Sequence, residues 1–195
     1  MSNSYLSSSL TFHSNKITCV MDEYGSEESI IMMDWEHPIM SASAAYVTEG
    51  GGDILEIGFG MGIASNYIQS HSISSHTIID PHPQIIEKAV EWANGKSNVT
   101  IISQSWADVT GSLGRYDGIF YDTSFDEKYN LFSSSLSNLT KSGTKLTFWN
   151  SNPNESNIFN IESTYRQINI IPPISSSQYF PSGSTKTYYM PMREF

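Results

Sequence analysis

Three glycines and two acids form the first group of residues whose spacing could do chemistry. In "DILEIGFGMGIA", Gly58, Gly60 and Gly62 follow a run of Ile and Leu, and Glu56 lies two residues before the first glycine. Glycines at a strand-to-helix turn let the main chain approach a ligand, and the N–H groups of the following helix favour a nucleotide or nucleoside. Asp80, in "HTIIDPHPQ", is expected at the end of the next strand, where a carboxylate can accept both ribose hydroxyls. The alternative is a glycine turn without a cofactor, with Asp80 as a helix cap.

The elements that must position these residues alternate between strands and helices. Strands alternating with helices predict a mostly parallel sheet covered on both faces. Two further runs near the C-terminus predict an antiparallel hairpin at the sheet edge. The expected fold class is therefore α/β, a doubly wound, mostly parallel seven-stranded sheet with an antiparallel C-terminal hairpin strand. The predicted strands lie near residues 54–59, 77–79, 99–102, 118–121, 145–149, 166–171 and 185–190.

The remaining segments predict one domain over residues 1–195. Its N-terminal arm (1–34) contains a candidate hairpin in "LTFHSNKITCVM" and an acidic loop, "DEYGSEES". The cofactor-binding core (35–150) is expected to begin with a helix that Asp34 caps. The substrate-side segment (151–195) is expected to hold a short helix and then the edge strands.

Composition narrows the class of partner. The chain of 195 residues has 20 acids and 10 bases, a net charge of -10, which repels phosphate backbones and anionic lipids and suits a cationic small-molecule substrate. Cys19 is the single cysteine, so an intramolecular disulfide is excluded, and the His residues show no metal-binding spacing. No stretch has the length of a membrane span and the N-terminus lacks a secretory pattern. These features predict a cytoplasmic protein without nucleic-acid, membrane or metal partners; a homodimer is left open.

Six ordered segments carry a family resemblance. "LEIGFGMGIA" and "IID" resemble the first two motifs of class I S-adenosylmethionine-dependent methyltransferases. Together with "MMDWEHPIM", "SHTIIDPHP", "SWADV", "YDGIFYDT" and "YYMP", they are similar to guanidinoacetate N-methyltransferase and the related fungal arginine Nδ-methyltransferases, closely over residues 32–150 and in outline at the C-terminus. The resemblance implies a Rossmann-like fold and S-adenosyl-L-methionine as cofactor.

Glu36 and Asp122 are the catalytic pair that the resemblance implies. Asp122 follows a predicted strand, and ligands of doubly wound sheets bind at the carboxyl ends of the strands. Glu36 is expected on a helix that can lie over the same cleft. Two carboxylates match a guanidinium, so Asp122 is the candidate base and clamp and Glu36 the second clamp. Alternatively, Glu36 only stabilises the dipole of its own helix, and Asp122 is a turn residue.

The resemblance assigns further residues to each side of this site. The alternative role for Trp106 is that of an aromatic residue of the core. The alternative role for Trp35 is to hold its helix to the domain. The expected cofactor residues are Glu56, Gly58, Gly60, Met61, Gly62, Asp80, Pro81, Trp106, Asp108 and Tyr121, and the expected substrate residues are Glu36, Asp122, Trp35 and Thr123.

The predicted function is methylation of a guanidino group of a small molecule such as guanidinoacetate, as in creatine biosynthesis. An arginine N-methyltransferase, acting on free or protein arginine, and a non-catalytic cofactor-binding member are the alternatives. Ser124 and Phe125 replace the aromatic residue and proline of the guanidinoacetate enzymes, which leaves the wall of the substrate pocket open.

Overall fold

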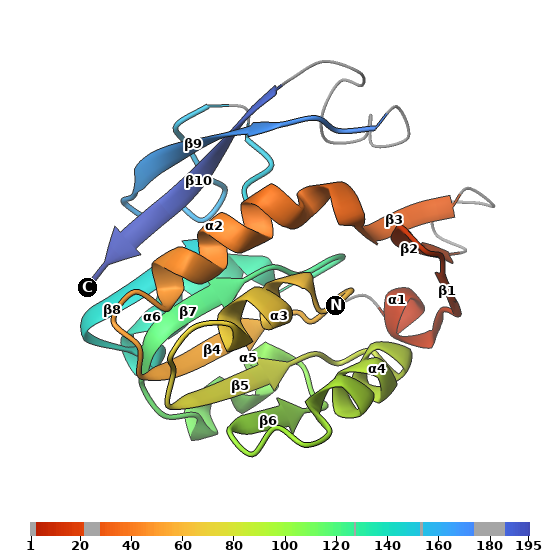
Figure 1. Cartoon of the computed structure of the whole chain (residues 1–195), viewed down its shortest axis with the longest axis horizontal. Helices are drawn as coiled ribbons and strands as arrows, with labels where there is room; N and C mark the ends of the chain where they lie inside the picture. Colours follow the sequence, from red (N-terminus) through yellow and green to blue (C-terminus); the bar gives the residue numbers. More distant parts are fainter. Residues whose placement is uncertain (1–2, 22–27, 127, 153, 174–185) are drawn as a thin grey trace.

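Seven strands form the central sheet of the computed structural model, which describes residues 3–21, 28–126, 128–152, 154–173 and 186–195. Five neighbouring strands are parallel, and the two C-terminal strands add antiparallel at one edge, as Figure 1 shows. The predicted fold class is confirmed. The sheet order is β6 (Val99–Ile102), β5 (Ser75–Ile79), β4 (Asp53–Ile57), β7 (Tyr116–Tyr121), β8 (Thr140–Phe148), β10 (Lys186–Glu194) and β9 (Thr164–Ile170).

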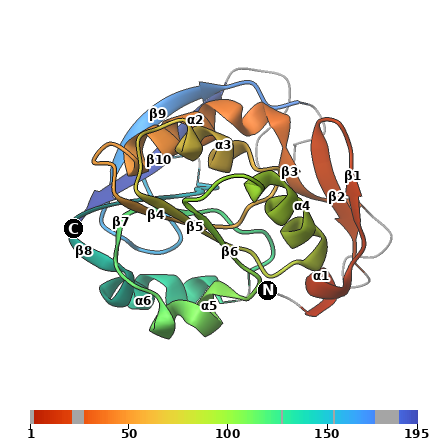
Figure 2. The ribbon, with the colours of Figure 1, turned by 60° about the horizontal axis from the view of Figure 1, so that its bottom comes forward.

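Helices cover both faces of the sheet, so its central strands are apolar on both sides. Alternate strand residues such as Ile54 and Phe120 pack against α2 and α3, whereas Leu55 and Ile119 face α5 and α6. Figure 2 shows these two helix layers on opposite sides of the sheet. The helices are α2 (His37–Val47), α3 (Ile63–Gln69), α4 (Pro83–Ala93), α5 (Trp106–Val109) and α6 (Phe132–Leu139), with 3-10 turns at η2 (Asp34–Glu36), η3 (Thr110–Ser112) and η4 (Tyr129–Leu131).

The strand order reverses between β4 and β7. The chain runs from β4 outward to β5 and β6, then returns to the other side of β4 as β7. Ligands of doubly wound sheets bind beside the carboxyl ends of the strands at such a point. The glycine turn follows β4 and Asp122 follows β7, so the topology places both predicted features at the reversal.

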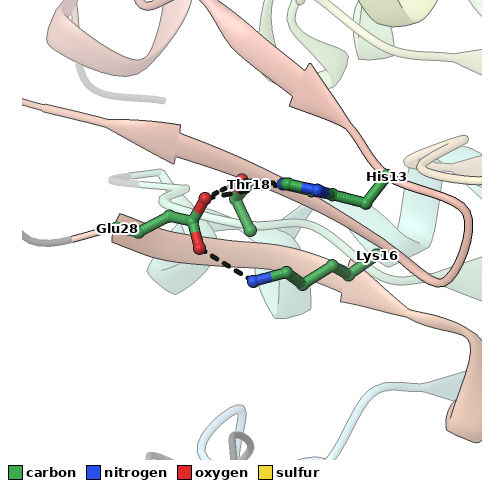
Figure 3. Close-up of polar contacts among 4 residues, drawn as sticks. All are labelled: His13, Lys16, Thr18 and Glu28. Atoms are coloured by element: carbon green, nitrogen blue, oxygen red, sulfur yellow. Dashed lines mark hydrogen bonds and ion pairs between the residues drawn. The ribbon is translucent and has the colours of Figure 1, made fainter.

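The N-terminal arm forms a separate three-stranded sheet. The arm comprises the helix α1 (Asn3–Ser7) and the strands β1 (Leu10–Phe12), β2 (Lys16–Val20) and β3 (Glu28–Met33). The predicted hairpin is confirmed, with Leu10 opposite Cys19. Figure 3 shows a polar cluster on this sheet, in which Lys16 and Thr18 donate hydrogen bonds to Glu28 at 2.8 and 2.7 Å. These two bonds lower the pKa of the Glu28 carboxyl to about 2.

Two local predictions are wrong. Asp34 does not cap α2: the 3-10 turn η2 precedes that helix, and Glu36 is its N-cap residue. The described residues between Asn150 and β9 form no helix, because the Asn150 side chain donates hydrogen bonds to Ser156 O and Tyr189 O and holds the segment as a loop. Most of the predicted acidic loop (residues 22–27) lies outside the described residues.

No helix within the described ranges is long and apolar enough to cross a membrane.

Candidate active site

The glycine turn ties the ends of β4 and β7 together. Gly58 has a φ of +96°, and a Cβ on it would overlap the carbonyl oxygen of Asp122. Backbone hydrogen bonds continue past the strand ends, from Gly58 N to Ile79 O and from Asp122 N to Ile57 O, both at 2.8 Å. Gly58 is therefore required by its positive φ and by this close approach, which fixes Asp122 beside the turn.

A cleft with about 460 Å³ of empty space lies over this turn. We call it the cofactor cleft. Four of the predicted cofactor residues line it: Glu56, Gly58, Gly60 and Asp80. Asp122 and Thr123, predicted for the substrate side, line it as well.

Asp80 connects the glycine turn to the start of α4. Its Oδ2 accepts a hydrogen bond from Phe59 N at 3.1 Å, and its Oδ1 accepts one from His82 N at 2.9 Å. Burial raises the pKa of this carboxyl to about 6, against the opposing effect of the two hydrogen bonds. Each carboxylate oxygen can accept a further bond, so Asp80 keeps acceptor capacity toward the cleft.

Glu56 is held on one oxygen and open on the other. Its Oε2 accepts a hydrogen bond from Ser65 Oγ at 2.6 Å and lies 2.8 Å from His76 Nε2. All three side chains are buried, and no described residue gives Oε1 a hydrogen bond. A buried acceptor without a donor is costly, so Oε1 is suited to a donor group in the cleft that Glu56 lines.

A second cavity adjoins the cofactor cleft. We call it the acceptor pocket. It has about 730 Å³ of empty space, and Trp35 and Glu36 line it. Ile31, Asp122, Thr123 and Ser124 line both cavities. Asp122 therefore stands at the boundary between the two.

Burial and neighbouring negative charge raise the cost of ionising both acids of the acceptor pocket. Glu36 accepts a hydrogen bond from Met33 N at 2.8 Å, which turns its carboxylate inward from η2. Burial and then the charge of Asp122 raise the pKa of Glu36 well above its usual range. Burial and then the charge of Glu56 raise the pKa of Asp122 to about 7. No hydrogen bond from the described residues reaches the Asp122 carboxylate, so a cation in this pocket would relieve both acids.

Known proteins resemble the chain in sequence and in fold. A family profile described as guanidinoacetate N-methyltransferase matches residues 25–154. The chain belongs to the guanidinoacetate N-methyltransferase family. Protein arginine N-methyltransferase 2 of Aspergillus oryzae is 34% identical over 157 residues, 75% of this chain and 36% of that protein. The protein of the same name from Kluyveromyces lactis is 41% identical over 110 residues, 51% of this chain and 26% of that protein.

Solved structures share the fold at low identity. The N-methyltransferase NodS from Bradyrhizobium japonicum has a TM-score of 0.59 at 13% identity and covers 81% of this chain and 94% of its own. Spermidine synthase from Thermotoga maritima has the same TM-score at 12% identity, and the match covers 94% of this chain and 72% of the synthase chain.

Family membership agrees with the predicted class, the S-adenosylmethionine-dependent N-methyltransferases. The chain spans about a third of the length of the Aspergillus relative. The activity, the cofactor and the acceptor of this chain are therefore proposals.

Three residues that the family resemblance assigned to the cofactor lie elsewhere. Trp106 and Tyr121 are buried in the core beneath the opposite face of the sheet, and both donate hydrogen bonds to Asp126. Asp108 is exposed on α5 and forms an ion pair with Lys128 at 2.7 Å. The geometry does not bring these three side chains to the cofactor cleft.

Three others lie at the margin of the glycine turn. Gly62, with a φ of +70°, is the N-cap of α3, and Pro81 directly follows Asp80. Met61 N donates a hydrogen bond to Met32 Sδ at 3.3 Å. None of the three belongs to the described lining of the cleft.

The N-terminal arm supplies lining residues that the sequence did not reveal. Tyr5 from α1 and Met32 from β3 line the cofactor cleft, and a Cβ on Gly60 would collide with Met32 Sδ. Burial and then the charge of Asp80 raise the pKa of Tyr5. Alternating apolar residues predicted an ordered hairpin here, but only its packing shows which cavity it covers.

Proposed function

We propose that this chain transfers a methyl group from S-adenosylmethionine to a nitrogen of a guanidino compound. The observation that carries the proposal is the place of Asp122, which lines both the cofactor cleft and the acceptor pocket with Glu36 nearby. A donor in one cavity and a nucleophile in the other would meet at this residue.

The cofactor side offers hydrogen-bond groups that fit the donor. Asp80 would accept the ribose hydroxyls, and Glu56 Oε1 would accept from the amino group of the methionine portion. When bound, S-adenosylmethionine supplies an electrophilic methyl group on a sulfonium.

The acceptor side fits a guanidinium. Glu36 and Asp122 would accept its N–H groups and hold one nitrogen in line with the methyl group. As the carbon–sulfur bond breaks and the nitrogen–carbon bond forms, Asp122 takes the proton that this nitrogen loses. The released cofactor product is neutral, and the carboxylates stabilise the positive charge that develops on the guanidino group.

Two acceptors follow from the family and its relatives. Guanidinoacetate, and with it a role as in creatine biosynthesis, is supported by the matched family description. Arginine is supported by the name of the relatives, although the chain matches only part of their length. The single cysteine, Cys19, supports a cytoplasmic location, and a homodimer stays a prediction.

The test is incubation with methyl-labelled S-adenosylmethionine and matched panels of guanidino compounds, primary amines and arginine peptides. We expect label on guanidino nitrogen, with rates that fall in Glu36→Gln and stay unchanged in Glu91→Gln, an exposed α4 acid. Label on amines alone would contradict the proposal. Cofactor binding without transfer to any compound would favour the non-catalytic alternative.

A further inference from the structure

A buried histidine beneath the cofactor cleft has no part in the chemistry described so far. His76 lies on β5, and its side chain points to the same face of the sheet as Glu56 on β4, because Glu56 pairs with Ile78 and side chains alternate along a strand. His76 Nε2 lies 2.8 Å from Glu56 Oε2, and both side chains are fully buried. The contact is therefore made inside the protein, where an unmatched polar group is costly.

Helix α3 supplies one further polar contact to each member of this pair. Ser65 Oγ donates a hydrogen bond to Glu56 Oε2 at 2.6 Å, and Gln69 Nε2 lies 3.4 Å from His76 Nδ1. Ser65 and Gln69 are four residues apart, so they share one face of the helix. The Trp92 ring of α4 meets the His76 ring with centroids 6.2 Å apart and planes at 88°. These contacts fix the imidazole ring between β5 and two helices.

The surroundings of the two ring nitrogens assign the proton of His76. An amide nitrogen only donates, so Nδ1 beside Gln69 is an acceptor, and the ring proton is on Nε2, which faces Glu56. Two lone pairs 2.8 Å apart would repel each other, so a proton must lie between Nε2 and Oε2. The proton is thus kept on the Oε2 side of the Glu56 carboxylate, and Oε1 stays an acceptor.

The free side of Glu56 belongs to a cleft without basic side chains. Among the residues described as lining the cofactor cleft, Glu56, Asp80 and Asp122 are acids, and none is Lys, Arg or His. His76 is not part of that lining, so it pairs with Glu56 without taking the place of a ligand. Glu56 Oε1 receives no hydrogen bond from the described residues, and an ammonium in the cleft would supply one.

We propose that His76 is a positioning residue for the cofactor. Together with Ser65 it holds Glu56 by Oε2, so that Oε1 is presented as an acceptor to the ammonium of the methionine portion of S-adenosylmethionine. His76 acts only through Glu56, since it lines neither the cofactor cleft nor the acceptor pocket as described. This inference rests on the proposed function and adds the residue through which the site selects the amino group of its donor.

The test measures the binding of two ligands by calorimetry. They are S-adenosylhomocysteine and its desamino analogue, in which hydrogen replaces the amino group. We expect the wild type to prefer S-adenosylhomocysteine about 30-fold, because the analogue loses a hydrogen bond between charged groups. In His76→Leu that preference should shrink to about threefold or less, while the affinity for the desamino analogue stays within about twofold of the wild-type value.

A conservative variant and a control accompany His76→Leu. His76→Gln keeps a donor near the place of Nε2, so it should retain a preference of at least about tenfold. His71→Gln changes an exposed histidine and should bind both ligands as the wild type does. Ser65→Ala removes a smaller group from the same oxygen of Glu56, and the preference should fall by at least about threefold.

The outcomes separate a positioning role from a structural one. The proposal is overturned if His76→Leu weakens both ligands equally, or if His76→Gln loses the preference as fully as His76→Leu does. If His76→Leu does not fold, an unchanged preference in Ser65→Ala overturns it. Equal wild-type affinity for the two ligands also overturns it and leaves guanidino methylation intact. If the wild type binds neither ligand, the proposed function fails with it.

Discussion

The cofactor cleft and the acceptor pocket both contain buried acids, but the protein holds those acids differently. Glu56 and Asp80 each receive hydrogen bonds or ion-pair contacts from described residues on two sides. Glu36 receives one backbone donor, and the Asp122 carboxylate receives none from the described residues. The cofactor side is therefore organised in advance, whereas the acceptor side leaves its charges for the ligand to neutralise. Preorganisation favours binding, and unrelieved charge favours selection of a cation.

The sharpest way to break this comparison is to remove the charge of Asp122. Asp122→Asn should lower the rate of methyl transfer about 1,000-fold, because the variant loses both the proton acceptor and one half of the clamp. Affinity for S-adenosylhomocysteine should stay within about twofold, measured by calorimetry. Transfer at the wild-type rate would show that Asp122 is not the base.

The converse variant acts on the cofactor side. Asp80→Asn should lower the affinity for S-adenosylhomocysteine about 30-fold, because the neutral amide accepts hydrogen bonds more weakly than the charged carboxylate. Glu91→Gln should bind as the wild type does. An unchanged affinity in Asp80→Asn, with the fold intact by circular dichroism, would remove the ribose assignment.

Much of the fold could be predicted because its central strands are buried on both faces. Such strands appear as short segments rich in apolar residues, which located β4 to β7 closely. β8 was predicted from Lys145, but it begins at Thr140, since its first residues are polar and carry no hydrophobic signal. The alternation of strands and helices predicted the parallel pairing, whereas the order of the strands is shown by the structure.

The candidate site was predictable only in part, because several of its contacts join residues that are far apart in the sequence. Glu36 and Asp122 could be paired through a family resemblance, which the family match supports. The contact between Glu56 and His76 crosses from β4 to β5, and the side chain of Asp126 meets Trp106, 20 residues away in the sequence. Local patterns carry no information on such contacts. Trp106 and Tyr121 were assigned by motif, but sheet parity directs Tyr121, and the packing of α5 directs Trp106, into the opposite core.

Changing the pH should sharpen the comparison without a mutation. Because the pKa of Asp122 is about 7 in the empty site, the carboxyl is mostly protonated at pH 6, and a bound guanidinium requires the ionised form. Binding therefore releases a proton, and acceptor affinity should rise about fivefold from pH 6 to pH 7, reach about tenfold at pH 8 and level off above it. Titrations in buffers of different ionisation enthalpy measure that proton. In Asp122→Asn the profile should flatten; a wild-type affinity independent of pH would contradict the assignment.

The smallest expected effect concerns stability, where the acceptor side should cost free energy. The pKa of Asp122 is raised on folding, so its contribution is fully present near pH 4 and is lost as the pH rises through about 7. Because this carboxylate is partly open to its cavities, the loss is about 1–2 kcal/mol rather than the full value of the shift. Asp122→Asn without ligand should therefore melt about 2–6 °C above the wild type at pH 8 and close to it at pH 4. Scanning calorimetry at the two pH values measures this difference. A variant less stable than the wild type at pH 8 would mean that Asp122 is a structural acid, held as firmly as those of the cofactor cleft.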